Sequence, residues 1–261
     1  MIPVLTKKEA FALDTSTISS GYLSEQELMD NAGKNIAQFI IEQLKDPFNQ
    51  SFVVLAGPGN NGGDAIICHY YLLDYGLHSQ LLLLDEKQKN SWIFKQYYIL
   101  NESIENYHNT YEPNPDYWYI DGIFGIGLKR DIFGNYKDII NSLIGISNII
   151  SIDIPSGIYC DTGTKAGTNI NAKFTLTMGY SKLGHYFNEG IDASGEVHVI
   201  DIGFKPLSST DSNSQLISKK DIIDKIPNNS NNIHKYSRGK LISISGSKGY
   251  TGACILAIQA A

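Results

Sequence analysis

The chain has 261 residues, of which 42% are hydrophobic and 18% are charged, and its formal net charge at pH 7 is −6. This length allows one large α/β domain, or a domain plus a small appendage. The acidic balance argues against a nucleic-acid-binding protein, because binding phosphates requires clustered Lys and Arg, and the sequence contains no such cluster.

The amino-terminal residues, MIPVLTKKEAFALD, lack the apolar core of a signal peptide. No apolar run reaches the roughly 20 residues that cross a bilayer, so no membrane anchor is expected. Cys68, Cys160 and Cys254 lie far apart and form no C-x-x-C motif, which argues against a disulfide framework. Together these features predict a cytoplasmic protein.

Apolar residues recur at helical spacing over residues 6–17 and again over 24–44. In the second stretch Ser24 is a suitable N-cap, and Glu27 three residues later completes a capping box. Two helices are therefore expected to open the chain.

From residue 52 onward, apolar strands alternate with helical patterns. Strands are expected at 52–56, 79–84, 117–120, 148–152 and 174–178, helices at 63–75, 91–100 and 135–146, and a last strand of mixed polarity at 196–200. Such alternation predicts a mostly parallel sheet. Right-handed crossovers then favour a doubly wound three-layer α/β/α sandwich that ends near Phe204.

Residues 206–232 are rich in Ser and Asn and are predicted to be a linker with one short helix at 218–226. They precede an apolar strand at 240–244, a glycine turn at 246–252 and a helix at 253–261. One strand and one helix cannot bury both their faces. This piece either docks on the first domain or on another chain, or, in the favoured interpretation, is the start of a truncated second α/β domain.

The stretch from Ser51 to Ala65, SFVVLAGPGNNGGDA, passes from a buried strand through a glycine turn into a helix. This order directs free backbone N–H groups at an anion. Residues 57–62 match the dinucleotide motif G-x-G-x-x-G, which favours a dehydrogenase. The two Asn residues and the following Asp64 favour a more polar function, and a turn that only joins strand to helix is the third alternative.

Two further polar loops follow strands of the same predicted sheet, DGIFGIGLKRD from Asp121 and IDIPSG from Ile152. The carboxyl ends of parallel strands meet at one edge, so these loops are expected to face the first one across a crevice. Asn61, Asp121 and Ser156 would offer amide, carboxylate and hydroxyl oxygens, a set that suits a hard cation. The alternative is a hydrogen-bonded network without metal.

Basic residues follow the predicted strands at 117–120 and 174–178. Lys129 and Arg130 could supply cations for a phosphate, although such a pair is often a solvated surface turn. Lys182 and His185 could line the crevice, but a lone histidine near a strand end is more often structural, and neither is included among the predicted site residues. The sequence has no H-E-x-x-H, G-x-S-x-G or P-loop motif, which argues against zinc hydrolases, serine esterases and P-loop proteins.

Five motifs in this order resemble the YjeF amino-terminal family, the NAD(P)H-hydrate epimerases: NAG at 31–33, GPGNNGGDA at 57–65, DGIFGIGLKRD at 121–131, IDIPSG at 152–157 and MGYSKLG at 178–184. The tail resembles the opening of the ADP- or ATP-dependent NAD(P)H-hydrate dehydratase, with HKYSRG at 234–239 and GSKGYTGA at 246–253. That ribokinase-like domain follows the epimerase in bifunctional repair enzymes. The predicted domains are therefore the epimerase at 1–205, the linker at 206–232 and an incomplete dehydratase domain at 233–261.

The resemblance implies a Rossmann-like fold and interconversion of the R and S forms of NADHX and NADPHX, whose nicotinamide ring is hydrated at C6. Such an enzyme binds a dinucleotide but transfers no hydride. It needs side chains that act as acid and base. A homodimer or higher homo-oligomer is also implied. The substrate-binding residues carried over by motif are Asn60, Asn61, Gly62, Gly63, Asp64, Gly125, Ile126, Gly127, Leu128, Lys129, Arg130, Asp131 and Asp153, and the potassium (K+) ligands are Asn61, Asp121 and Ser156.

For the chemistry, acid-assisted loss of the C6 hydroxyl group, or ring opening, would make C6 planar and let it react from the other face. Asp153 is the first choice for proton transfer, and Lys129 either assists or holds phosphate. Dehydratase activity is not expected from the incomplete tail. The alternatives are a module that binds a nucleotide-like ligand without turnover and, less favoured, an NAD(P)-dependent dehydrogenase.

Overall fold

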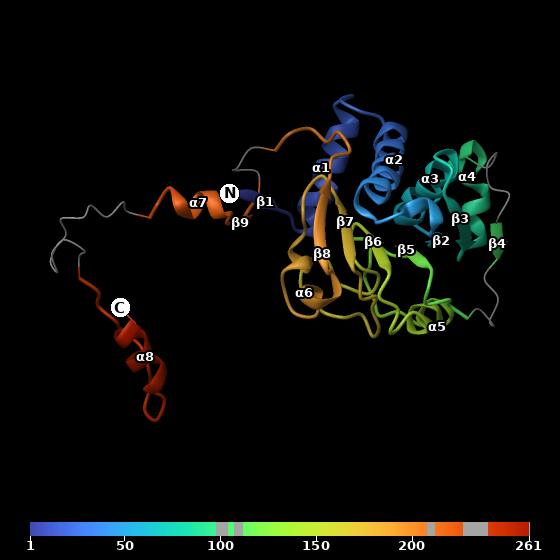
Figure 1. The fold of residues 1–261 in the computed structure, drawn as a ribbon. Helices are drawn as coiled ribbons and strands as arrows, with labels where there is room; N and C mark the ends of the chain where they lie inside the picture. Colours follow the sequence, from blue (N-terminus) through green and yellow to red (C-terminus); the bar gives the residue numbers. More distant parts are fainter. Residues whose placement is uncertain (98–103, 107–111, 208–211, 227–239, 261) are drawn as a thin grey trace. The chain divides into compact units, whose positions relative to one another are not determined.

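The computed structural model describes residues 1–97, 104–106, 112–207, 212–226 and 240–260 (Figure 1). The chain divides into two units, Met1–Leu216 and Ile217–Ala261. The first unit contains the sheet and the predicted site residues.

The first unit is built on a seven-stranded sheet in the order β4-β3-β2-β5-β6-β7-β8. Every neighbouring pair is parallel, as the alternation of strands and helices predicts. The strand order changes direction between β2 and β5, so the polar loops that follow these two strands flank the topological switch point. The strands are β2 (Ser51–Ala56), β3 (His78–Leu83), β4 (Ile104–Asn106), β5 (Trp118–Gly122), β6 (Ile149–Ile152), β7 (Phe174–Met178) and β8 (Glu196–Ile200).

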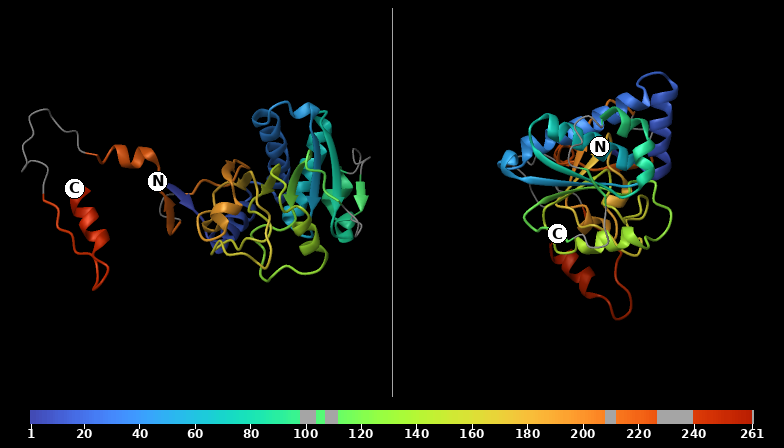
Figure 2. Two further views of the ribbon diagram at one scale, coloured as in Figure 1. Left: turned by 60° about the horizontal axis from the view of Figure 1, so that its bottom comes forward. Right: turned by 90° about the vertical axis from the view of Figure 1, so that its right-hand side faces the viewer.

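Helices cover both faces of the sheet, which makes the sheet the middle layer of a sandwich (Figure 2). The side chains of β2 alternate between two cores: Phe52 and Val54 pack with α2 and α3, whereas Val53 and Leu55 pack with α5. The helices of this unit are α1 (Lys7–Ser19), α2 (Glu25–Gln43), α3 (Asn60–Asp74), α4 (Trp92–Tyr97), α5 (Asn135–Ser142) and α6 (Gly190–Ala193). Over the described ranges, no helix is both long and apolar enough to cross a lipid bilayer.

The predicted helices of the first unit are present, with some ends shifted. Helix α3 begins at Asn60 instead of residue 63, so the polar motif forms the first helical turn and Gly59 is the N-cap. Helix α5 ends at Ser142, short of the predicted residue 146. The predicted helix at 91–100 corresponds to α4 as far as Tyr97, and the remaining positions lie outside the described residues.

Three short strands are not evident from the sequence: β4 (Ile104–Asn106) at the edge of the large sheet, and β1 (Ile2–Val4) and β9 (Ser214–Leu216), which pair antiparallel with each other. Three residues carry too little periodicity to reveal a strand. Strand β9 lies within the predicted linker, and the first compact unit extends to Leu216, beyond the predicted domain end at 205. The amino terminus and the segment before the second unit are thus joined by backbone hydrogen bonds.

In the second unit, helix α7 (Lys219–Ile223) lies within the short helix predicted at 218–226 and ends before its predicted end. Ser218 is its N-cap, and Asp221 completes a capping box. Helix α8 (Gly252–Ala260) covers most of the predicted last helix. The predicted strand at 240–244 is wrong, because none of its residues forms a β-pair with another described residue. Its backbone lacks the partner that a strand requires. The assignment of 233–261 to an incomplete dehydratase domain stays a prediction.

Candidate active site

A cavity of about 350 Å³ opens at the carboxyl end of the sheet, beside the switch point. Its lining comes from α1, α2 and the start of α3, from the loops after β5, β6 and β7, and from the segment that follows β8. A largely apolar cavity with a few converging polar groups is the usual form of a small-molecule site. The polar side chains in the lining are Asp14, Glu25, Asn60, Asn61, Asp64, Asp153 and Lys182.

The loop after β2 reaches the cavity because its backbone packs directly on other backbone. A Cβ atom on Gly57 would lie 1.9 Å from the carbonyl oxygen of Ile123, and one on Gly62 would lie 2.0 Å from the carbonyl oxygen of Gly57. Around Gly59, by contrast, no heavy atom lies within 4 Å of the position of a Cβ. Close packing of backbone on backbone therefore requires glycine at positions 57 and 62 but not at position 59.

Replacing Gly57 by Ala is expected to lower the free energy of unfolding by at least about 1–3 kcal/mol, because the new methyl group overlaps backbone that cannot move independently. Gly59→Ala is the matched control and is expected to cost less than about 1 kcal/mol, since only the modest N-cap preference for Gly is lost. Urea unfolding of both variants measures the difference. Equal effects would contradict the packing account of this loop.

Asp153 directly follows β6 and adopts a φ of 65°, in the left-handed region that few residues besides Gly, Asn and Asp enter. Its N–H donates to the carbonyl oxygen of Leu176 at 2.8 Å. Its carbonyl oxygen lies 2.9 Å from Nε2 of His185, whose Nδ1 accepts the N–H of Lys182 at 3.2 Å. Because Nδ1 is an acceptor, Nε2 carries the proton and donates to Asp153. Both sides of this strained turn are thereby held in place.

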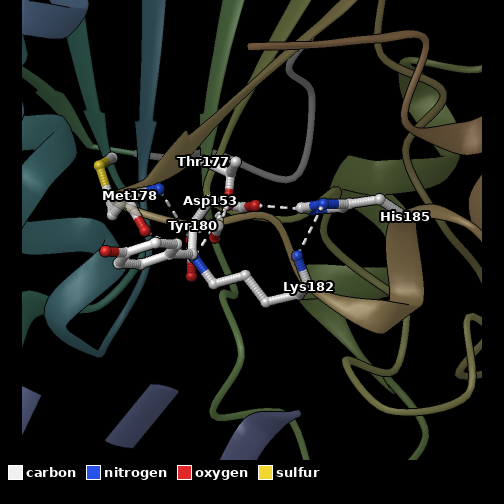
Figure 3. Close-up of polar contacts among 6 residues, drawn as sticks. All are labelled: Asp153, Thr177, Met178, Tyr180, Lys182 and His185. Carbon is white, nitrogen blue, oxygen red and sulfur yellow. Dashed lines mark hydrogen bonds and ion pairs between the residues drawn. The ribbon is translucent and has the colours of Figure 1, made fainter. Parts of the chain in front are cut away.

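Lys182, in the loop after β7, points to the carboxylate of Asp153 and is only 3% exposed. Its ammonium group forms an ion pair with Oδ1 of Asp153 (Figure 3). It also donates to Oγ1 of Thr177 at 2.8 Å and to the carbonyl oxygen of Met178 at 3.1 Å. All three N–H donors therefore have acceptors, as a buried ammonium group requires.

The two carboxylate oxygens of Asp153 differ in their surroundings. Oδ1 accepts hydrogen bonds from Oγ1 of Thr177 at 3.1 Å and from the N–H of Met178 at 3.3 Å, in addition to its ion pair with Lys182. Oδ2 accepts no hydrogen bond from any described residue. One oxygen thus anchors the side chain, and the other is available to a molecule in the cavity.

The charges at this pair follow from burial and from its neighbours. Burial raises the pKa of Asp153, but the charge and hydrogen bond of Lys182, followed by smaller effects of His185 and the N–H of Met178, outweigh it, so the net pKa is lower than usual. Burial and the positive charge of Lys182 lower the pKa of His185 to about 4. At neutral pH, Asp153 is therefore ionised and His185 is neutral.

Asp121, at the end of β5, is completely buried and is the acceptor of a dense network. It accepts from Oγ of Ser151 at 2.8 Å, from the N–H and Oγ of Ser156 at 2.9 and 2.5 Å, and from the N–H of Ile123 at 3.2 Å. The Oγ of Ser156 in turn accepts the N–H of Phe124 at 2.8 Å. Burial raises the pKa of Asp121, and these hydrogen bonds only partly offset the shift.

Asn61 lies beside the same loop, in the first turn of α3. A Cβ on Gly125 would lie 3.0 Å from its Oδ1. Its Nδ2 is buried and finds no hydrogen-bond partner among the described residues. The structure thus brings Asn61 next to the short 122–125 segment, whose Phe124 is bonded to Ser156.

The loop after β5 contributes only its first half to the cavity. Gly125, Ile126 and Gly127 line it, whereas residues 128–131 do not. Leu128 packs against the core around α5, and Lys129, Arg130 and Asp131 are exposed. Gly62 and Gly63 are buried in α3 and do not line the cavity either. Lys129 is therefore not brought together with Asp153.

The residue that sequence reasoning left out is Lys182. It appears in the motif MGYSKLG after a parallel strand, and the carboxyl end of that strand meets those of β5 and β6. That position was a usable signal, because side chains following neighbouring parallel strands converge. A lysine at such an end can neutralise a carboxylate from the adjacent strand.

The fold and the cavity define a Rossmann-like α/β protein with a polar small-molecule site at the switch point of its sheet. The family model described as YjeF-related protein N-terminus matches residues 25–184, and the chain belongs to this family. The crystal structure of the yeast protein YNL200c is similar, with a TM-score of 0.63 and 22% sequence identity over 76% of this chain and 87% of that one.

Two curated relatives differ in length. The bifunctional NAD(P)H-hydrate repair enzyme Nnr of Dictyoglomus turgidum is 37% identical over 247 residues, which is 90% of this chain and 47% of the relative. The NAD(P)H-hydrate epimerase of Oenococcus oeni is 32% identical over 206 residues, which is 76% of this chain and 96% of the relative. The chain thus spans about half the length of the bifunctional relatives and nearly all of the epimerase.

Proposed function

We propose that the unit Met1–Leu216 is an NAD(P)H-hydrate epimerase, an isomerase that repairs damaged cofactors by interconverting the R and S forms of NADHX and NADPHX. The proposal is supported by the family membership and by the near full-length match to a relative named for this activity. The observation that carries it is the carboxylate of Asp153, held ionised with one free oxygen beside the cavity. Epimerisation needs such a base and no hydride acceptor.

The carbon to be inverted, C6, bears a hydroxyl group and is bonded to the ring nitrogen. Loss of that hydroxyl group as water would make C6 planar, and water could then add to the opposite face. Asp153 is proposed to take a proton during this exchange through Oδ2, while Lys182 keeps the carboxylate oriented and charged.

The dinucleotide's phosphates are proposed to lie at the start of α3 and along Gly125–Gly127. The N-cap Gly59 supplies no side-chain hydrogen bond to the first turn of α3, which leaves helix N–H groups for an anion. Lys129 and Arg130 are exposed outside the cavity lining and are proposed to approach the phosphates from there. A role for Lys129 in proton transfer is not supported by this placement.

Asn61, Asp121 and Ser156 are proposed to hold a potassium ion. The set fits, because it combines amide, carboxylate and hydroxyl oxygens with the carbonyl oxygen of Phe124, which lies 3.2 Å from Oγ of Ser156. Oδ1 of Asn61 is the atom that would face the cation, because the Nδ2 group is a donor. Nδ2 has no hydrogen-bond partner among the described residues and would donate to an acceptor on the substrate. A bound cation there would offset the charge of Asp121 and of a nearby phosphate.

Assembly and location complete the proposal. A homodimer or higher homo-oligomer, and a cytoplasmic location, are proposed on the basis of the family resemblance. Dehydratase activity is not proposed for the second unit.

The proposed function is tested by incubating the purified chain with separated S and R epimers of NADHX and following their interconversion by chromatography. Turnover is expected in potassium chloride, and a clear loss of rate is expected when tetramethylammonium replaces potassium. Binding without interconversion would support a binding module, and reduction of NAD by a hydroxylated substrate would support a dehydrogenase. Equal rates in both salts would contradict the proposed potassium site but not the proposed epimerase activity.

A further inference from the structure

The carboxyl groups that line the cavity are not balanced by cations. Asp14, Glu25, Asp64 and Asp153 line it together with Lys182, the one basic side chain that the described part of the chain contributes to the lining. Lys182 uses its three donors on Asp153, Thr177 and Met178, so it is not shared with the other carboxyl groups. The two carboxyl groups nearest the ends of the central strands, Asp64 and Asp153, therefore have opposite environments.

Asp64 lies in the first two turns of α3 and has no ion pair or hydrogen bond with a described residue. Asp153 faces it from the end of β6, and Asp14 faces it from α1, so both nearby charges are negative. Cys68, one turn further along α3, is a neutral thiol whose pKa is raised by burial and by Asp64. The N-terminus of α3 favours an ionised Asp64, which opposes the effects of burial and of the two nearby negative charges.

We infer that Asp64 is the general acid of the epimerase and Asp153 its general base, so that the two carboxyl groups act as a pair across one cavity. The inference rests on the proposed function and deepens it. Burial, followed by the charges of Asp153 and Asp14, raises the pKa of Asp64 well above its usual value, whereas the pKa of Asp153 is lowered. Two carboxyl groups whose surroundings separate their pKa values are suited to opposite roles.

The carboxyl group of Asp64 gives its proton to the C6 hydroxyl oxygen, the C6–O bond breaks with its electron pair leaving on water, and the lone pair of the ring nitrogen forms a C6=N bond. Water attacks C6 from the other face as that double bond returns its electrons to nitrogen, and Oδ2 of Asp153 takes a proton from the added water. The proton then returns to Asp64 through cavity water. The intermediate is a cation, which the acidic lining stabilises.

The test is the pH dependence of epimerisation by Asp64→Asn. Wild-type kcat/KM should be highest where Asp153 is ionised and Asp64 protonated, and should fall as alkaline pH ionises Asp64. In Asp64→Asn, kcat should fall about 10²- to 10⁴-fold with little change in KM, and the alkaline decline should disappear. Asp64→Glu should recover part of the rate and the alkaline decline, because it restores an acid.

Two further variants separate this role from a structural one. Asp74→Asn makes the same substitution at an exposed position of α3 and should leave rate and pH profile unchanged. Asp14→Asn should move the alkaline decline to lower pH without abolishing it, because one of the charges that raise the pKa of Asp64 is removed. A folded Asp64→Asn variant with wild-type kcat and an intact alkaline decline would overturn the inference. A wild-type chain without epimerase activity would instead overturn the proposed function.

Discussion

Asp153→Asn is expected to lower kcat for epimerisation about 10²- to 10⁴-fold, because an amide cannot accept the proton that Oδ2 of Asp153 is proposed to take. The substitution is a clean one for the backbone, since Asn is among the residues that tolerate the φ of 65° at this position. It also keeps an oxygen for the N–H of Met178 and the hydroxyl of Thr177. The measurement is kcat on each purified epimer at neutral pH.

The same variant leaves Lys182 buried without its counter-charge, so folding must be checked beside activity. Thermal unfolding followed by circular dichroism establishes the temperature at which the variant is still folded, and kcat is then measured below it. A folded Asp153→Asn protein that interconverts the epimers at the wild-type rate would show that Asp153 is not the base.

Lys182→Met is expected to have the largest effect on stability, about 3–5 kcal/mol at neutral pH, because it leaves the carboxylate of Asp153 buried and unpaired. In the wild type the pKa of Asp153 is lowered, so its contribution to stability is present above the usual carboxyl pKa and is lost as pH falls through the folded value. Without Lys182, burial raises that pKa instead. The loss should therefore shrink as the pH is lowered, which urea unfolding at neutral and mildly acidic pH can measure.

Lys173→Met is the matched control, because Lys173 lies 5.1 Å from the centre of the Trp118 ring at the surface and should cost only about 0.5–1 kcal/mol. The double variant Lys182→Met with Asp153→Asn should be more stable than the sum of the single changes predicts, because it removes both charges of one pair. Additive effects of the two substitutions would show that the pair is not coupled.

Much of the fold could be predicted because its signals are local. Apolar strands alternating with amphipathic helices indicate a parallel sheet, and six of its seven parallel strands lie where that pattern predicts them. The exceptions have physical causes. Strands β1, β4 and β9 are each three residues long, and β1 and β9 are formed by pairing with each other across the chain, which no local pattern shows. The apolar stretch at 240–244 has the composition of a strand but forms no β-pair with any described residue.

Part of the candidate site could likewise be predicted from the sequence, and part depends on tertiary packing. Asp121 and Asp153 could be placed at one edge because Asp121 lies at the carboxyl end of β5 and Asp153 directly follows β6. The inclusion of Lys129 followed from its position on a glycine loop, and the path of that loop away from the cavity depends on how Leu128 packs against the core. The importance of Gly57 and the freedom of Gly59 depend on which backbone lies nearby.

The sequence alone was enough to predict that acidic, amide and hydroxyl groups lie at the ends of several strands and share one crevice. This was possible because the alternation of strands and helices is visible in short segments of the chain. The sequence was not enough to assign the charges of these groups. Asp153 is 29 residues from Lys182, and only packing makes them partners while leaving Asp64 without a cation among the described residues. Protonation depends on burial and on the distance to other charges, and both are set when distant segments pack together.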